Sequence, residues 1–296
     1  NLIKYIETSG YKVYKLPKNK PIKSHNSSAN NNLNNWLGVS QEIDAIECKE
    51  IIANLNPDWL IVDHYFIDRQ WELILKRNNL KIMVIDDLAN RKHNCEVLLD
   101  QNYYLYPKDR YSNLIPKNCH KLLGPRFSLL REEFVNFRTK KTYSKDKKFH
   151  VFIFMGSADK DNQTLKAINS VIYFLEKGES ISADVLVGSI NIHSVQIELL
   201  CKKYSEITFY KSPNNIAELM SKADVSIGAG GSTSIERCYL GLPSLVISLA
   251  KNQVETTKAL DSIGAICDLG WFESVDEKII ITMIKKLMNS KSFLKS

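Results

Sequence analysis

The stretch Ala223-Asp224-Val225-Ser226-Ile227-Gly228-Ala229-Gly230-Gly231-Ser232-Thr233-Ser234-Ile235-Glu236-Arg237 predicts a buried strand, a glycine turn and the first turn of a helix. The glycines of residues 228–231 permit backbone angles that a side chain would block, and Ser232 or Thr233 is suited to cap the helix. A strand, small residues and a helix start bring free backbone N–H groups and the positive end of the helix dipole to one point. The stretch therefore predicts an anion site, most simply for phosphate.

Glu236 lies about one turn into the predicted helix, where its carboxylate is placed to accept hydrogen bonds from two neighbouring hydroxyls, as on a ribose. In the alternative interpretation the stretch is a tight turn with a helix cap, and Glu236 only favours the helix dipole. The glycines alone leave both interpretations open.

Length and composition limit the class of protein. A chain of 296 residues with 44% hydrophobic residues suits two domains with ordinary cores. No apolar run approaches the roughly 18–20 residues of a membrane span, which predicts a soluble chain without membrane insertion. The six cysteines are scattered without CxxC spacing, which argues against a zinc cluster or a disulfide framework and suits the cytoplasm.

The net charge of +7 does not by itself indicate a polyanionic partner. Lysines are spread along the whole chain, which favours a solvated surface. The most basic run, residues 139–148, contains only one aromatic residue, so we expect no nucleic-acid partner. The same run is poor in apolar residues and is predicted to be a linker between domains of residues 1–138 and 149–296.

Strands and helices alternate on both sides of this linker. In the first half we predict a helix over residues 1–10, strands at 11–16, 59–65, 81–85 and 96–99, and a polar loop over residues 18–35. The second half supplies about six strands and a last helix at 274–288. The fold class is therefore α/β, with two Rossmann-like domains that face each other across a cleft. The smaller number of strands in the first domain predicts that its amino-terminal part is missing.

Asp63, His64 and Tyr65 form the polar carboxyl end of the buried strand predicted at 59–65. Because parallel sheets gather functional residues beyond the carboxyl ends of their strands, these residues are predicted to line a ligand site. Asp63 would orient a partner, His64 would exchange a proton, and Tyr65 would hold a sugar or a phosphate. In the alternative interpretation Asp63 accepts hydrogen bonds from the following turn, and His64 is a satisfied polar residue.

Two further strand ends carry polar pairs. Asp86 and Asp87 are adjacent and point in divergent directions, so a cap or a bond to the Arg91 region is favoured over shared acid–base chemistry or a metal site. Asn252 and Gln253 follow the strand at 243–247, and their amides are suited to read sugar hydroxyls or acetamido groups. The alternative for Asn252 is a helix cap.

These motifs together resemble the UDP-2,4-diacetamido-2,4,6-trideoxy-β-L-altropyranose hydrolases of pseudaminic acid biosynthesis, which have the GT-B fold of MurG. The matching stretches are 58–65, Trp71-Glu72, 84–91, Leu123-Gly124-Pro125 with Leu130-Arg131, 228–233 with Glu236-Arg237-Cys238, 240–244 and Asn252-Gln253. Each stretch alone is weak, and their order along the chain makes the resemblance specific.

The resemblance implies attack of water on a UDP-sugar, with release of UDP and the free sugar, by a monomer that uses no metal and no cofactor. The carboxy-terminal domain would bind UDP. The residues implied in substrate binding are Gly156, Ser157, Gly230, Gly231, Ser232, Thr233, Glu236, Asn252 and Gln253, with the diphosphate at the 230–233 turn and the ribose at Glu236. The residues implied in catalysis are Tyr65, Asp63 and Asn252.

The sequence departs from the family pattern in two places. The family has a Gly-rich loop with a histidine, its presumed catalytic base, and no stretch of this sequence matches that loop. In addition, Met155 precedes Gly156 where the family more often has a second glycine. Two alternatives therefore stay open, a GT-B glycosyltransferase that passes the sugar to an acceptor and a UDP-binding module without catalysis.

Overall fold

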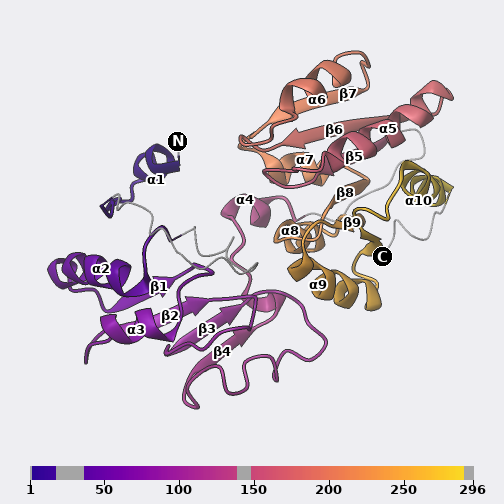
Figure 1. Cartoon of the computed structure of the whole chain (residues 1–296). Helices are drawn as coiled ribbons and strands as arrows, with labels where there is room; N and C mark the ends of the chain where they lie inside the picture. The colour runs from indigo at the N-terminus through magenta and orange to yellow at the C-terminus, as the bar shows by residue number, and fades with distance from the viewer. Residues whose placement is uncertain (1, 18–36, 139–147, 290–296) are drawn as a thin grey trace, which may run out of the picture. The chain divides into compact units, whose positions relative to one another are not determined.

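A computed structural model describes residues 2–17, 37–138 and 148–289 of the chain (Figure 1). The chain forms two compact units, one of residues 1–101 and 106–127 and the other of residues 102–105 and 128–296. The predicted loop at 18–35 lies wholly outside the described residues, and so does the predicted linker at 139–148 apart from Lys148.

The first unit contains a parallel sheet in the order β1-β2-β3-β4. Its strands are β1 (Trp59–Val62), β2 (Lys81–Ile85), β3 (Val97–Asp100) and β4 (His120–Leu123). Its helices are α1 (Leu2–Thr8), α2 (Gln41–Leu55), α3 (Arg69–Leu75) and the short 3-10 helix η1 (Pro125–Phe127). Trp71 and Leu75 of α3 pack with Ile82 and Leu98 of the sheet in one buried cluster, so α3 covers the sheet through its apolar side.

Local hydrogen bonds fix where the helices of this unit begin. The hydroxyl of Ser40 accepts from the N–H of Ile43 at the start of α2, and the carboxylate of Asp68 accepts from the N–H of Gln70 at the start of α3. Each bond satisfies one of the N–H groups that a helix start leaves without an intrahelical partner.

The second unit contains a parallel sheet of six strands in the order β10-β9-β8-β5-β6-β7. Its strands are β5 (Phe149–Phe154), β6 (Ile181–Val187), β7 (Ile207–Lys211), β8 (Val225–Ala229), β9 (Ser244–Ser248) and β10 (Cys267–Trp271). Its helices are α4 (Glu132–Asn136), α5 (Gln163–Glu176), α6 (Ser194–Cys201), α7 (Ile216–Lys222), α8 (Thr233–Tyr239), α9 (Lys251–Ser262) and α10 (Glu277–Asn289).

Helices cover both faces of this sheet (Figure 1). Val151 and Ile153 of β5 face a core that includes α5 and α10, whereas Phe152 between them faces a second core with α4 and α7. Because both faces are buried, β8 and β9 are apolar or small at every position. The strand order is that of a doubly wound Rossmann sheet.

The alternation of strands and helices and the six strands of the second half are confirmed. The strand predicted at 11–16 is wrong, since these residues form no strand and Tyr11 and Tyr14 are exposed. The strand β4 was not predicted from the sequence. Residues 128–138 belong to the second unit, because Phe134 of α4 is fully buried in its core and Glu133 accepts a hydrogen bond from the N–H of Ala217.

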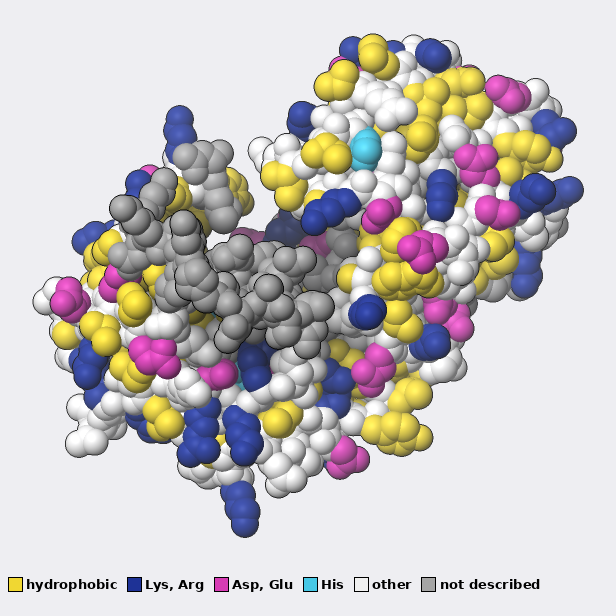
Figure 2. All heavy atoms as spheres, viewed as in Figure 1, with side chains coloured by type: hydrophobic (Ala, Val, Ile, Leu, Met, Phe, Trp, Pro, Cys, Tyr) yellow, Lys and Arg dark blue, Asp and Glu magenta, His cyan; other side chains and the backbone are white. Residues whose placement is uncertain are grey.

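The surface agrees with the scattered charges of the sequence. On the face shown in Figure 2, Lys and Arg side chains lie interspersed with acidic and apolar ones. Among the described helices, none has the length and apolar character that crossing a membrane would take.

Candidate functional site

The second sheet changes direction between β5 and β8. These strands are neighbours, but the chain leaves β5 towards β6 on one side and leaves β8 towards β9 on the other. Crevices beyond the carboxyl ends of strands at such a switch point are the preferred ligand sites of open α/β sheets. The ends of β5, β8 and β9 carry the predicted residues Gly156, Ser157, 230–233 and 252–253.

The turn after β8 presents backbone donors without acceptors. The N–H of Gly230 donates to the carbonyl of Ile247 at 3.2 Å, and helical bonding resumes with Ser234. None of the described residues accepts a hydrogen bond from the N–H groups of Gly231, Ser232 or Thr233. Consecutive free N–H groups in a turn are donors of the kind that binds anions.

The predicted helix cap is wrong in its details. Ser232 occupies the N-cap position of α8, but its hydroxyl accepts no hydrogen bond from the helix. The turn therefore keeps its N–H groups available for a ligand, which a side-chain cap would have prevented.

The corresponding turn after β5 differs in this respect. The carboxylate of Asp159 accepts from the N–H groups of Gln163 and Thr164, both at 2.9 Å, and so satisfies the start of α5. A buried carboxylate at that position repels an anion.

Gly156 has a φ of +87°, and the backbone of Ser157 lies against Gly188, where a Cβ would come within 2.4 Å of the Ser157 Cα. Gly156 and Ser157 lie at the end of β5 beside the crevice, whereas the N–H groups without acceptors belong to the turn after β8.

The turn packs against α9 at Gly230. A Cβ at Gly230 would lie 2.4 Å from the hydroxyl oxygen of Thr257 and 3.3 Å from the Cβ of Gln253, so a side chain there requires Thr257 to change its rotamer or α9 to move. The Oε1 of Gln253 accepts from the N–H of Leu249 at 2.8 Å. The amide nitrogen of Gln253 would lie 3.8 Å from a Cβ at Gly231, beside the free N–H groups.

Thr257 is a site residue that the sequence reading missed. Its side chain is buried, and its hydroxyl has no hydrogen-bond partner among the described residues. No motif marks it, because its relation to Gly230 arises only when α9 packs beside the turn. Asn252 is exposed in the first turn of α9, and α9 begins after Ala250 without a side-chain cap, so the capping alternative for Asn252 is wrong.

Glu236 extends from α8 towards Arg131. The Oε1 of Glu236 lies 3.2 Å from Nη2 of Arg131, whose Nη1 also pairs with Glu133 at 2.6 Å. Burial raises the pKa of the Glu236 carboxyl, and the opposing effect of Arg131 is smaller. The two residues lie in the same unit, although Arg131 comes before the linker predicted from the sequence.

In the first unit Asp63, His64 and Tyr65 follow β1, as predicted. Asp63 is exposed, and no hydrogen bond to its carboxylate occurs within the described parts of the chain. The Nδ1 of His64 accepts from the N–H of Phe66 at 3.2 Å, and burial lowers the pKa of the imidazole. A neutral ring that completes its own turn matches the satisfied-residue interpretation of His64.

Tyr65 and the two aspartates that follow β2 have partners within the first unit. Burial and a hydrogen bond to Asp87 raise the pKa of Tyr65 to about 12. The Oδ1 of Asp86 lies 2.6 Å from Nη1 of Arg91, which confirms the predicted bond between Asp86 and the Arg91 region. Its other oxygen accepts from the N–H of Ala89 at 2.9 Å, so both carboxylate oxygens of Asp86 bond to groups of the first unit.

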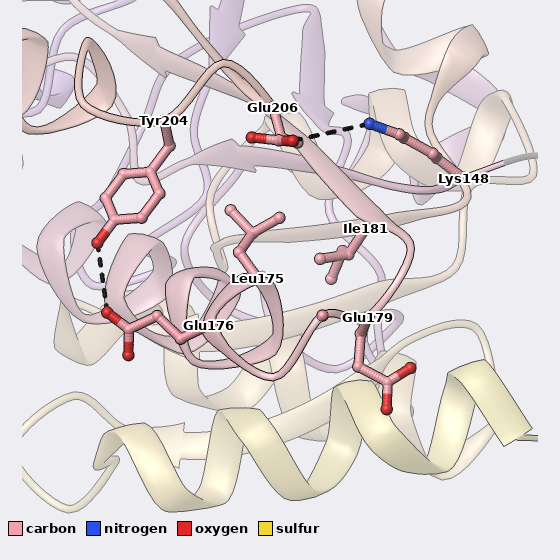
Figure 3. Close-up of a pocket in the computed structure, with 8 residues that line it drawn as sticks. Lys148, Leu175, Glu176, Glu179, Ile181, Tyr204 and Glu206 are labelled. Carbon is pink, nitrogen blue, oxygen red and sulfur yellow. Dashed lines mark hydrogen bonds and ion pairs between the residues drawn. The ribbon is translucent and has the colours of Figure 1, made fainter.

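A surface cavity of about 310 Å³ lies elsewhere in the second unit (Figure 3). Lys148, Ile181 and Glu206 line it at the starts of β5, β6 and β7. Glu206 pairs with Lys148 at 3.9 Å, and Tyr204 donates to Glu176 at 3.4 Å (Figure 3). The cavity is thus at the amino ends of these strands, opposite the crevice, and none of the predicted site residues lines it.

The sequence and the fold match known proteins. Residues 141–296 match the model of the glycosyltransferase family 28 C-terminal domain. The chain is 30% identical over 219 residues to the UDP-2,4-diacetamido-2,4,6-trideoxy-β-L-altropyranose hydrolase of Campylobacter jejuni, which covers 74% of this chain and 76% of that protein.

A further relative and a solved structure are similar to this chain at lower sequence identity. A Helicobacter pylori protein named pseudaminic acid cytidylyltransferase and UDP-2,4-diacetamido-2,4,6-trideoxy-β-L-altropyranose hydrolase is 27% identical over 70% of this chain and 37% of its own length. The crystal structure of Acinetobacter baumannii MurG superposes with a TM-score of 0.54 and 15% identity, over 85% of this chain and 71% of that one. At this identity the likeness concerns the fold alone.

Two parallel, Rossmann-like sheets with a glycine turn at the switch point of the second make this chain a protein of the GT-B fold class. Within that class, the chain belongs to the UDP-2,4-diacetamido-2,4,6-trideoxy-β-L-altropyranose hydrolase family. The family resemblance predicted from the sequence is confirmed.

Proposed function

We propose that this chain hydrolyses a UDP-linked 2,4-diacetamido-2,4,6-trideoxy sugar to UDP and the free sugar, as a step of pseudaminic acid biosynthesis. The observation that carries the proposal is the row of free N–H groups on Gly231, Ser232 and Thr233 at the switch point. A diphosphate is the part of such a substrate that needs these donors. The name of the Campylobacter jejuni relative supports the choice of sugar.

In this proposal the turn acts on the leaving group. Negative charge grows on the diphosphate as water attack releases UDP, and fixed N–H donors stabilise that charge without having to reorganise. Gln253 adds an amide donor beside Gly231. Glu236 binds the ribose hydroxyls, and Arg131 keeps the Glu236 carboxylate oriented before the nucleotide arrives.

The remaining predicted residues are proposed to contact the nucleotide or the sugar. Gly156 and Ser157 are proposed to border the nucleotide at the end of β5. Asp63, Tyr65 and Asn252 are proposed to act on the sugar, since all three are exposed beyond strand ends. With a pKa of about 12, Tyr65 acts as a hydrogen-bond donor and not as a base at neutral pH.

The test is release of UDP from UDP-2,4-diacetamido-2,4,6-trideoxy-β-L-altropyranose by the purified chain and by Glu236→Ala. Isothermal titration with UDP accompanies the kinetics, and Glu179→Ala, at the unrelated cavity, is the matched control. We expect release of UDP by the chain and weaker UDP binding by Glu236→Ala only. A chain that binds no UDP, or equal UDP binding by Glu236→Ala and the parent chain, would contradict the proposal.

A transferase is the second candidate, because the matching family model is that of a glycosyltransferase domain. The fold is common to both reactions, so only the fate of the sugar separates them. UDP release that requires an added acceptor, with the sugar recovered on that acceptor, would favour transfer. UDP release with free sugar as the product in the absence of any acceptor would favour hydrolysis.

A further inference from the structure

Arg237 is the largest fully buried side chain of the described residues. It belongs to α8, and its Nη2 donates to the carbonyl oxygen of Ala229 at 2.7 Å and to the hydroxyl of Ser234 at 2.9 Å. One nitrogen of the guanidinium thus joins the last residue of β8 to the first turn of α8. The segment between these two anchors is the turn with the free N–H groups.

The rest of this guanidinium has no partner. Its Nε and Nη1 are buried without a hydrogen bond, and no carboxylate of the described residues forms an ion pair with it. The carboxylate of Glu236, its neighbour in sequence, pairs with Arg131 and favours the charge of Arg237 only through space, without a hydrogen bond to it. Burial lowers the pKa of Arg237 to about 10, which leaves the group protonated at pH 8. An unpaired buried charge is costly, so its retention calls for a compensating anion.

The sequence also makes room for this charge. A Cβ at Gly228 would lie 2.1 Å from Nη1 of Arg237 and 2.7 Å from the carbonyl oxygen of Phe154. Glycine at this position therefore lets the guanidinium lie directly behind the turn, against β8 and its neighbour β5. The three residues that carry the free N–H groups are half-buried or exposed.

We infer that Arg237 is an electrostatic positioning residue for the diphosphate, acting from behind the turn of residues 230–233. It holds the turn through Ala229 and Ser234, and its unpaired positive charge attracts an anion that binds to the N–H groups without direct contact. The inference rests on the proposed function, since it takes the anion to be the diphosphate of a UDP-sugar. In the water-poor interior this attraction is screened far less than that of a surface lysine.

The test compares a charged and an uncharged ligand. Binding of UDP and of uridine is measured at pH 8 by titration calorimetry and ligand-observed NMR for the parent chain, Arg237→Met and Arg237→Lys. Lys166→Met is the matched control, since it removes a half-buried positive charge that is bonded to the carbonyls of Phe272 and Val275. Thermal melting confirms that each variant is folded.

We expect Arg237→Met to weaken UDP binding by about tenfold or more relative to uridine, the loss of one charge interaction at close range. Arg237→Lys keeps the charge and is expected to restore most of the preference for UDP, and Lys166→Met to leave it unchanged. If Arg237→Met does not fold, the lysine variant alone decides. Its preference for UDP is then expected to stay within about threefold of that of the parent chain, and a larger loss overturns the inference.

Two outcomes separate this inference from the proposed function. Equal weakening of UDP and uridine in a folded Arg237→Met shows that Arg237 only shapes the turn, and it overturns the inference. If the parent chain itself binds no UDP, the proposed function fails first, and the inference fails with it.

Discussion

The guanidinium of Arg131 lies 3.2 Å from the carboxylate of Glu236, yet the pKa of Glu236 is raised. Arg131 is half exposed, so solvent screens its attraction for Glu236, and it also pairs with Glu133. The burial of Glu236 outweighs that attraction. The folded chain therefore keeps a carboxylate that its surroundings disfavour, which is typical of a residue held for binding and not for stability.

Glu236→Gln is expected to stabilise the chain at pH 7.5 and to weaken its binding of UDP. A carboxyl whose pKa is raised by folding contributes stability below its unfolded pKa and loses that contribution as the pH rises through the folded pKa. The advantage of the glutamine should therefore shrink as the pH falls from 7.5 to below 4.5, the ordinary value for Glu236. Thermal melting between pH 4 and 8 measures this trend, with the exposed Glu132→Gln as control.

The opposite pattern would contradict this account of Glu236. If Glu236→Gln melts at a lower temperature than the parent chain at pH 7.5, the pair with Arg131 is stabilising and the carboxylate is there for structure. Unchanged melting of Glu132→Gln over the same range would show that the trend belongs to Glu236 and not to charge in general.

Gly230→Ala is expected to destabilise the chain, whereas Gly231→Ala is not. The first Cβ would lie 2.4 Å from the hydroxyl oxygen of Thr257, and the second lies 3.8 Å from its nearest neighbour, an ordinary contact. Overpacking of this kind costs about 1–3 kcal/mol, to be measured by urea unfolding. The double variant Gly230→Ala with Thr257→Ala should recover most of the loss, because it removes the clashing oxygen. Additive losses in that double variant would show that the contact is not the cause.

Much of the second unit was predictable because its strands are buried on both faces. Such strands appear as continuous apolar runs, as in β5. The edge strand β4 begins with the exposed residues His120 and Lys121, so it carries no such signal. The alternation at 11–16 failed for the converse reason, because a pattern of period two makes a strand only where a neighbouring strand pairs with it.

The glycine turn was predictable as well, since glycine and hydroxyl residues between a strand and a helix favour a tight turn at the start of the helix. The interactions around it were not. Arg131 and Glu236 are separated by 105 positions, and no local pattern joins them. Thr257 and Arg237 gain their meaning from the packing of α9 and from the space beside Gly228, which only the three-dimensional structure supplies.

Glu72→Ala is expected to destabilise the first unit strongly. Glu72 and His93 are both fully buried, with Oε1 and Nδ1 2.6 Å apart, and the second oxygen of Glu72 accepts from the N–H of Asn94. Removal of the carboxylate leaves the buried ring nitrogen of His93 and the partly buried N–H of Asn94 without their acceptor, a loss of about 3–5 kcal/mol by urea unfolding. Glu50→Ala, at an exposed position of α2, should stay within about 0.5 kcal/mol. A small loss for Glu72→Ala would show that water or a local shift replaces the carboxylate.

His64→Asn is expected to keep UDP-release activity, although His64 lies beyond the end of β1. The Nδ1 of His64 accepts from the N–H of Phe66, and an asparagine oxygen can accept the same bond, as in an Asx turn. Because burial lowers the pKa of the imidazole, NMR titration should give a midpoint below 6.5 and a neutral ring at pH 7. We expect rates of UDP release within about twofold of the parent chain and the same pH profile, since the ring only completes its turn. A folded His64→Asn that has lost activity, together with a changed pH profile, would instead make His64 a proton-transfer residue of the reaction.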